Sequence, residues 1–266
     1  MARVLITGCS TGIGRAAAVE LTKRGFDVIA TARRIETLED LDVAEKHALD
    51  VNDGSSVGAL REAVGQVDVL VNNAGIGIHA PVEKGPLDAF SKVLETNVLG
   101  ALRMIQAFAP QMRERGSGVI VNVSSIAGRV AAPLGGFYSA SKYALEALSE
   151  ALHYEVGHWN VRVAIVEPGG FDTSFGDNRM AFATDEPPYD ELDRIWEKSQ
   201  ATLQGAAGSR PGPEVVAQTI ADAVEGKEQK LRWPVGDDAN LVLQVRTSMN
   251  DEDFEATMRQ TLGLDW

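Results

Sequence analysis

Short continuous apolar runs alternate with longer stretches of helical periodicity along the first two thirds of the chain. The apolar runs predict buried strands at residues 4–7, 26–32, 67–71, 119–123 and 161–166. Helical spacing predicts helices at residues 13–24, from 87 to about 115, and beyond Tyr138, where Leu145, Leu148, Leu152 and Val156 recur. Because the strands are continuously apolar, both faces of the sheet are expected to be covered. The alternation favours an α/β fold with a doubly wound parallel sheet.

The pattern changes after residue 170. Residues 171–212 are polar and aromatic, with Pro187, Pro188 and several glycines as interruptions. This segment is predicted to be an insertion that lies over the sheet, so that residues 1–266 form a single domain. Beyond it, the pattern predicts a helix at 213–224, a last strand at 231–235 and a terminal helix at 254–262.

Composition narrows the class of protein. A chain of 266 residues that is 44% hydrophobic can bury a sizeable core. Its net charge of −13 argues against nucleic acid and against anionic membranes as partners. One cysteine, Cys9, fits a reducing compartment. We see no run of about 18 apolar residues and no signal peptide, so we expect a cytoplasmic protein.

A glycine-rich turn follows the first predicted strand and runs into the first predicted helix. Glycines let the backbone approach a phosphate closely, and the helix offers free N–H groups and the positive end of its dipole. No Gly-Lys-Ser/Thr follows, which argues against a nucleotide-triphosphatase loop. The turn therefore predicts a dinucleotide site in a Rossmann-type sheet. Its predicted contacts are Gly8, Ser10, Thr11, Gly12, Ile13 and Gly14.

The end of the second predicted strand favours NADP(H) over NAD(H). NAD sites place an acidic residue there to hold the ribose hydroxyls. Here the sequence is Ala-Thr-Ala followed by Arg33 and Arg34. A guanidinium group can pair with a 2′-phosphate, and Arg33 is the preferred candidate. The alternative is that both arginines lie in solvent.

Tyr138 and Lys142 are four residues apart on a predicted helix, with Ser125 thirteen residues upstream of the tyrosine. A free tyrosine titrates near about 10, and lowering that value by three units takes about 4 kcal/mol. One positive charge about 4 Å away, at an effective dielectric constant of about 20, supplies that amount. We therefore expect Lys142 to lower the pKa of Tyr138 and make it a proton donor and acceptor. The alternative is an ordinary surface pair.

Together these motifs resemble the short-chain dehydrogenase/reductase family over residues 3–175. The resemblance is strongest for the branch of 17β-hydroxysteroid and retinol dehydrogenases and its bacterial relatives. It implies contacts to the adenine by Asp50 and Val51, to its ribose by Asn73, Ala74 and Gly75, and to the nicotinamide by Pro168, Gly169, Phe171 and Thr173. It also implies that Tyr138 and Lys142 contact the cofactor as well as catalysing.

The resemblance implies an NADP(H)-dependent oxidoreductase that interconverts a ketone or aldehyde and an alcohol by hydride transfer. Tyr138 would exchange the proton, Ser125 would orient the same oxygen, Lys142 would hold the nicotinamide ribose, and Asn97 would position a relay water. The family's usual assembly implies a homodimer or homotetramer, through helices around residues 87–115 and 138–157.

The segment 171–212 is expected to act as a substrate lid. Its aromatic residues are Phe171, Phe175, Phe182, Tyr189 and Trp196. They favour a lipophilic substrate such as a steroid, retinoid or aryl ketone. The alternative is that they only pack the lid onto the domain. A reductase of acyl-thioester ketones is one alternative function, although acids outnumber bases around the predicted entrance. A non-catalytic dinucleotide sensor is another, although the chain keeps all four catalytic residues. The histidines lack metal-ligand spacing, so we predict no metal.

Overall fold

A seven-stranded parallel sheet forms the centre of the computed structural model, which describes residues 1–176, 179–184, 186–207 and 210–264. The strand order is β3-β2-β1-β4-β6-β7-β9, so the order reverses between β1 and β4. The bounds are β1 Arg3–Ile6, β2 Asp27–Ala32, β3 Glu45–Ala48, β4 Val69–Asn72, β6 Gly118–Val123, β7 Val161–Pro168 and β9 Arg232–Val235. The predicted doubly wound Rossmann-type sheet is confirmed.

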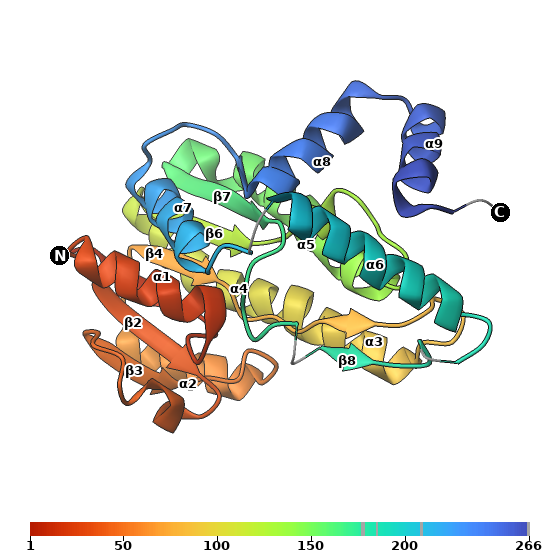
Figure 1. Cartoon of the computed structure of the whole chain (residues 1–266). Coiled ribbons are helices and arrows are strands. Elements are labelled where there is room, and N and C mark those ends of the chain that lie inside the picture. The colour runs from red at the N-terminus through yellow and green to blue at the C-terminus, as the bar shows by residue number, and fades with distance from the viewer. Residues whose placement is uncertain (177–178, 185, 208–209, 265–266) are drawn as a thin grey trace.

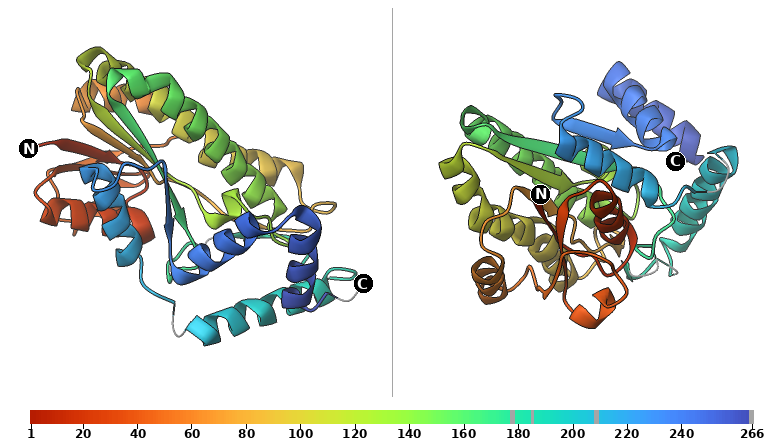
Figure 2. Two further views of the ribbon diagram at one scale, coloured as in Figure 1. Left: turned by 90° about the horizontal axis from the view of Figure 1, so that it is seen from above. Right: turned by 90° about the vertical axis from the view of Figure 1, so that its left-hand side faces the viewer.

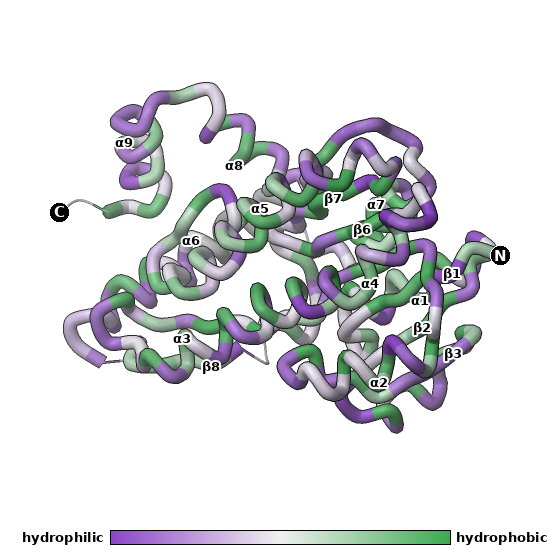
Figure 3. Tube along the Cα trace, turned by 180° about the vertical axis from the view of Figure 1, so that it is seen from behind, coloured by the Kyte–Doolittle hydropathy of each residue, from purple (hydrophilic) through white to green (hydrophobic). Residues whose placement is uncertain are grey.

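Helices cover both faces of this sheet (Figures 1 and 2). One layer contains α1 Gly12–Lys23 and α7 Glu214–Glu225, and the other contains α2 Gly54–Val64, α4 Ala101–Arg115 and α5 Gly136–Val156. Alternate residues of β1 enter the two cores: Val4 and Ile6 pack toward α1 and α7, and Leu5 packs toward α2 and α4. Figure 3 shows hydrophobic residues gathered in the central strands. This double burial explains the continuous apolar runs in the sequence.

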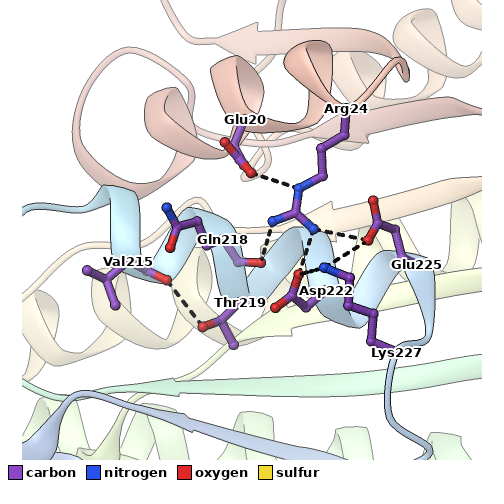
Figure 4. A network of polar contacts seen from close by, with 8 residues as sticks. All are labelled: Glu20, Arg24, Val215, Gln218, Thr219, Asp222, Glu225 and Lys227. Carbon is purple, nitrogen blue, oxygen red and sulfur yellow. Dashed lines mark hydrogen bonds and ion pairs between the residues drawn. The ribbon is translucent and has the colours of Figure 1, made fainter.

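A charged network joins α1 to α7 on the outside of the first layer (Figure 4). Arg24, the C-cap of α1, pairs with Glu20 at 2.7 Å, Asp222 at 2.6 Å and Glu225 at 3.1 Å. These carboxylates raise the pKa of Arg24, so its charge is fixed at any working pH. The network holds α7 against α1, the helix that follows the glycine loop.

The predicted long helix at 87–115 is three elements. It consists of α3 Leu87–Leu94, a π turn at Glu95–Gly100 and then α4. A Cβ on Gly100 would lie 2.7 Å from Val51 Cγ2, so only glycine fits where this turn meets the loop after β3. The wider turn places Asn97 at the backbone of Ile76, and π turns of this kind occur often at functional sites.

Several elements escaped the sequence pattern. Strand β3 is at the polar edge of the sheet, and α2 begins with Gly-Ser-Ser after its N-cap Asp53. Helices α6 and α8 are polar on average. Their bounds, with the terminal helix α9, are α6 Asp190–Ala207, α8 Asp237–Ser248 and α9 Asp251–Leu262. Three 3₁₀ turns lie at Ile35–Leu38, Ile126–Gly128 and Gly157–Trp159.

The segment after β7 attaches to the loop after β4. Strand β8 Met180–Ala181 pairs in parallel with β5 Ile78–His79. The side chain of His79 contacts Asp193 of α6 at 2.8 Å, and Lys84 donates to the carbonyl of Pro187. Helix α9 then packs against α6 (Figures 1 and 2). Within the residues that the structure describes, no helix is both long and apolar enough to cross a lipid bilayer.

Candidate active site

The glycine loop is shaped by its contact with the end of β4. Gly8 and Gly12 have φ of 76° and 59°, which favours glycine. A Cβ on Gly14 would lie 2.3 Å from Asn73 Nδ2 and 2.4 Å from the carbonyl oxygen of Gly8. Glycine at position 14 is therefore required by packing, and Gly14 does not line the cleft described below.

Asn73 and Thr7 fasten this loop in place. The Asn73 side-chain amide donates to the carbonyls of Thr7 at 2.9 Å and Gly8 at 3.1 Å. The Thr7 hydroxyl accepts from the backbone N–H groups of Asn73 and Ala74, both at 3.0 Å. Thr11 is the N-cap of α1, and its side chain makes no capping hydrogen bond with any described residue. The N-terminal N–H groups of α1 are thus left to face the cleft, as an anion site needs.

A cleft of about 960 Å³ runs along the carboxyl ends of the strands. It lies where the strand order reverses between β1 and β4, the position at which open α/β sheets bind ligands. Besides Ser125, Tyr138 and Lys142, it is lined by nearly all the predicted cofactor residues: Gly8, Ser10, Thr11, Gly12, Ile13, Arg33, Asp50, Val51, Asn73, Ala74, Gly75, Pro168, Gly169, Phe171 and Thr173. Sequence motifs from six loops therefore meet in one cavity.

Ser125, Tyr138 and Lys142 meet at the inner part of this cleft. The hydroxyl of Ser125 hydrogen-bonds that of Tyr138, and it also accepts from the N–H of Ala127 at 3.1 Å. Lys142 is buried, and its Nζ donates to the carbonyl of Val123 at 2.9 Å. The same Nζ lies 5.7 Å from the centroid of the Tyr138 ring. The three side chains therefore lie close enough together to influence one another's ionisation.

The ionisation of this group differs from the sequence expectation. Burial raises the pKa of Tyr138 to about 12, and the hydrogen bond from Ser125 offsets only part of that rise. Burial also lowers the pKa of Lys142 to about 8, against the charge of Glu146, which raises it. The pKa of Tyr138 therefore lies above its usual value, whereas the sequence argument expects Lys142 to bring it below that value. Desolvation by burial is the largest influence on the tyrosine pKa, and the ammonium group of Lys142 donates to the Val123 carbonyl.

Asn97 lies behind the cleft and does not line it. It is 2% exposed, and its amide donates to the carbonyl of Ile76 and to the hydroxyl of Ser141, both at 3.0 Å. Its Oδ1 accepts from the N–H of Ile76 at 2.8 Å. A Cβ on Gly75 would lie 3.3 Å from this oxygen and 3.8 Å from the Nζ of Lys142. Asn97 and Lys142 therefore flank the same glycine.

The predicted lid aromatics divide into two groups. Phe175 is 40% exposed, and its ring centroid lies 5.5 Å from that of Tyr138 in the cleft. Phe171 also lines the cleft but is mostly buried in the core near Trp233. Phe182 packs against the cluster around β5, and Tyr189 lies beside Lys84, so both fasten the segment to the domain. Phe175 is the aromatic side chain best placed to meet a substrate.

Sequence reasoning missed several residues of the cleft. Among the described residues, its charged lining is one acid, Asp50, and five bases: Arg33, Arg34, Lys92, Lys142 and Arg210. A cavity this basic in a chain of net charge −13 favours an anionic ligand. No sequence motif marks Lys92, which is on α3, or Arg210. The segment of Arg210 is held near Gly170 by the hydrogen bond from the N–H of Asp172 to the carbonyl of Pro211. Asp238 of α8 also escaped notice, although it accepts from the N–H of Gly170 at 2.6 Å beside the cleft.

Ser124 differs from its neighbour Ser125. Ser124 is only 4% exposed, but it lines the cleft as Ser125 does. Within the described part of the chain, its Oγ has no hydrogen-bond partner. The same described part contains no group of three or more His, Cys, Asp or Glu side chains suited to hold a metal ion.

Comparison with known proteins identifies the class to which this fold and site belong. Residues 2–183 match the short chain dehydrogenase family. The chain is 37% identical to human 17-beta-hydroxysteroid dehydrogenase type 1 over 251 residues, which cover 86% of this chain and 76% of the human protein. The protein therefore belongs to the short-chain dehydrogenase family and is an oxidoreductase.

Solved structures agree. A short-chain dehydrogenase from Streptomyces avermitilis aligns with a TM-score of 0.84 and 37% identity, covering 100% of this chain and 99% of the other. A short chain dehydrogenase from Burkholderia cenocepacia in complex with NADP aligns with a TM-score of 0.78 and 25% identity, covering 98% and 97%. The fold seen here is thus the fold of this family.

Proposed function

We propose that this protein is an NADP(H)-dependent oxidoreductase that interconverts a ketone or aldehyde and an alcohol. The observation that carries the proposal is the meeting of Ser125, Tyr138 and Lys142 in a cleft whose other walls are a glycine loop and exposed arginines. The human relative is named as a 17-beta-hydroxysteroid dehydrogenase, which supports an alcohol or ketone as substrate. The bound nicotinamide would supply or accept the hydride.

The residues have distinct parts in this reaction. In reduction, Tyr138 gives its phenolic proton to the developing alkoxide, and in oxidation it takes the proton of the alcohol. Its pKa near 12 in the protein without cofactor keeps it protonated, ready to donate. Ser125 hydrogen-bonds Tyr138 and is placed to hold the same substrate oxygen. Asn97 fixes the backbone of Ile76 behind Lys142, and we propose that this corner also holds a water that passes protons to solvent.

The dinucleotide fits the residues of the cleft. The packing that forbids a side chain at Gly14 shapes a backbone cradle for the pyrophosphate at the start of α1. Val51 and Asn73 lie where the adenosine half would reach, and Thr173 lies against Gly12 on the nicotinamide side. Arg33 is exposed at the end of β2, free of the acidic neighbour that would bind a ribose hydroxyl. We propose that it pairs with the 2′-phosphate of NADP(H).

The substrate is proposed to be lipophilic. Phe175 lies beside Tyr138 and over Gly77, where a Cβ would come within 3.0 Å of its ring. A flat apolar molecule approaching the tyrosine would contact this ring. We propose that residues 171–212 act as the substrate lid of a single domain, anchored by β8 and α6 to the loop after β4.

The protein is also proposed to form a homodimer or homotetramer in the cytoplasm. An apolar groove of about 100 Å³ follows α4 and α5, and Leu148 is 39% exposed beside it. Covering this groove with a second copy would remove apolar surface from water.

The proposed activity is tested by following NADPH oxidation with steroid, retinoid and aryl carbonyl compounds. Turnover at a rate above the no-substrate control supports the proposal. No turnover with any of them, while NADPH binds tightly, would contradict the lipophilic substrate.

A further inference from the structure

Five charged side chains gather behind the reacting group and outside the cleft. They come from four elements that meet there, which are α5, the turn after Ser125, β7 and β9. Two of them are nearly inaccessible to solvent: Glu146 is 4% exposed and Glu167 is 1% exposed. The members are Glu146, Glu150, Glu167, Arg129 and Arg232. Buried carboxylates need such partners, because the loss of hydration is costly.

Arg232 is the centre of this cluster. Its Nε donates to Glu146 Oε2 at 3.1 Å and lies 3.7 Å from Glu167 Oε1, and its Nη2 pairs with Glu150. Arg129 donates to Glu167 at 2.9 Å. Three carboxylates and two guanidinium groups leave one negative charge in the cluster. Lys142 is one helical turn before Glu146 on α5.

Glu146 has an oxygen that Arg232 does not use. Within the described part of the chain, neither Glu146 Oε1 nor Ser124 Oγ has a hydrogen-bond partner. Both side chains adjoin Gly128, where a Cβ would lie 2.9 Å from Glu146 Cγ and 2.9 Å from Ser124 Oγ. The same Cβ would lie 3.1 Å from the backbone oxygen of Lys142. Glu146, Ser124 and the backbone of Lys142 therefore surround the same glycine, on the side of α5 that faces the turn after Ser125.

We propose that Glu146 is a positioning residue whose buried carboxylate keeps Lys142 in its ammonium form. The proposal rests on the proposed function, in which that ammonium group holds the cofactor ribose and acts on Tyr138. Burial works against the charged lysine and lowers its pKa to about 8, whereas the charge of Glu146 raises it. Without Glu146, the lysine would lose its proton within the physiological pH range.

In the described part of the chain, the charged groups that face Glu146 come from its own helix and from three other elements. Lys142 and Glu150 are on its own helix, Arg129 follows the 3₁₀ turn, and Glu167 and Arg232 come from β7 and β9. The guanidinium of Arg232 weakens the field of Glu146 at Lys142, and Glu167 strengthens the negative field. Removing the carboxylate of Glu146 therefore shifts Lys142 toward the neutral amine.

The test is a pH titration of Lys142 in Glu146→Gln, with Glu150→Gln as the matched control. Glu150 pairs with the same arginine, but its side chain is 44% exposed and therefore screened by solvent. The protein is labelled with [ε-¹³C]lysine, and the Lys142 resonance is assigned by its loss in Lys142→Met. We expect the midpoint to fall by about one pH unit in Glu146→Gln and by less than about 0.3 in Glu150→Gln.

An unchanged midpoint in Glu146→Gln, or equal shifts in both variants, overturns the proposal and leaves the cluster a purely structural one. If the glutamine variant does not fold, Glu146→Met removes the same charge without a polar group to satisfy, and the same criterion applies. The titration needs neither substrate nor turnover, so its result tests the role of Glu146 independently of the proposed function. In an active enzyme, the alkaline limb of kcat should move by the same amount.

Discussion

Replacing Gly14 by alanine tests how the glycine loop is held. The added Cβ would lie 2.3 Å from Asn73 Nδ2 and 2.4 Å from the carbonyl oxygen of Gly8, so the loop or the asparagine must move. Moving Asn73 breaks its bonds to Thr7 and Gly8, worth about 1 kcal/mol each. Overpacking adds about 1–3 kcal/mol. We expect the free energy of unfolding to fall by about 3 kcal/mol or more, and Tm by about 6–12 °C.

The matched control is Gly58→Ala in α2, where a Cβ meets nothing within 4 Å. It should raise the free energy of unfolding by about 0.5–1 kcal/mol, because alanine is the better helix former. Thermal unfolding by circular dichroism and NADPH binding by fluorescence titration measure both variants. We expect Gly14→Ala to bind NADPH at least about tenfold more weakly. A Gly14→Ala protein that matches the wild type in Tm and in NADPH affinity would refute this account of the loop.

Three further predictions concern the cofactor, the substrate and the lysine. Arg33→Ala should lower the kcat/KM ratio of NADPH to NADH by about tenfold or more, because a charge-assisted pair is lost; an unchanged ratio removes Arg33 from the 2′-phosphate site. Phe175→Ala should raise KM for an aryl ketone by about tenfold and change KM for acetone little, since only the larger molecule reaches the ring. Equal effects on both KM values would argue that Phe175 does not contact the substrate. Burial lowers the pKa of Lys142 from 10.5 to about 8, so between these pH values the unfolded chain binds more protons than the folded one, and the contribution of Lys142 to stability rises with pH. In denaturant titrations, the free energy of unfolding should therefore rise less between pH 8 and pH 10 in Lys142→Met than in the wild type. An equal rise in both proteins would contradict this prediction.

The sequence predicts the elements that bury apolar residues on both sides. The runs at β1, β2, β4, β6 and β7 stand out because a doubly covered strand has no polar face. Strand β3 does not, because it is at the edge of the sheet and reads Glu-Lys-His-Ala. The π turn is equally hidden, because residues 95–100 keep a helical pattern in the sequence and only the backbone of the structure shows the wider turn.

The site was predictable where a motif has a specific chemical role. Glycines after a first strand and the spacing of Ser125, Tyr138 and Lys142 led to residues that share a cleft. The raised pKa of Tyr138 was not predictable, because spacing places Lys142 on the same helix face but does not show how strongly the tyrosine is desolvated by burial. Arg210 lies too far along the chain from these motifs for any spacing to relate it to them.

The most direct measurement is NADPH-dependent reduction of a carbonyl substrate by Tyr138→Phe beside the wild type. This change removes one hydroxyl from a half-buried ring, so the fold and the cofactor cleft should persist. We predict that kcat falls by at least about 10²-fold, as expected for loss of the proton donor, while the Kd for NADPH stays within about twofold. Turnover close to that of the wild type, with NADPH bound normally, would contradict the central claim that Tyr138 transfers the proton.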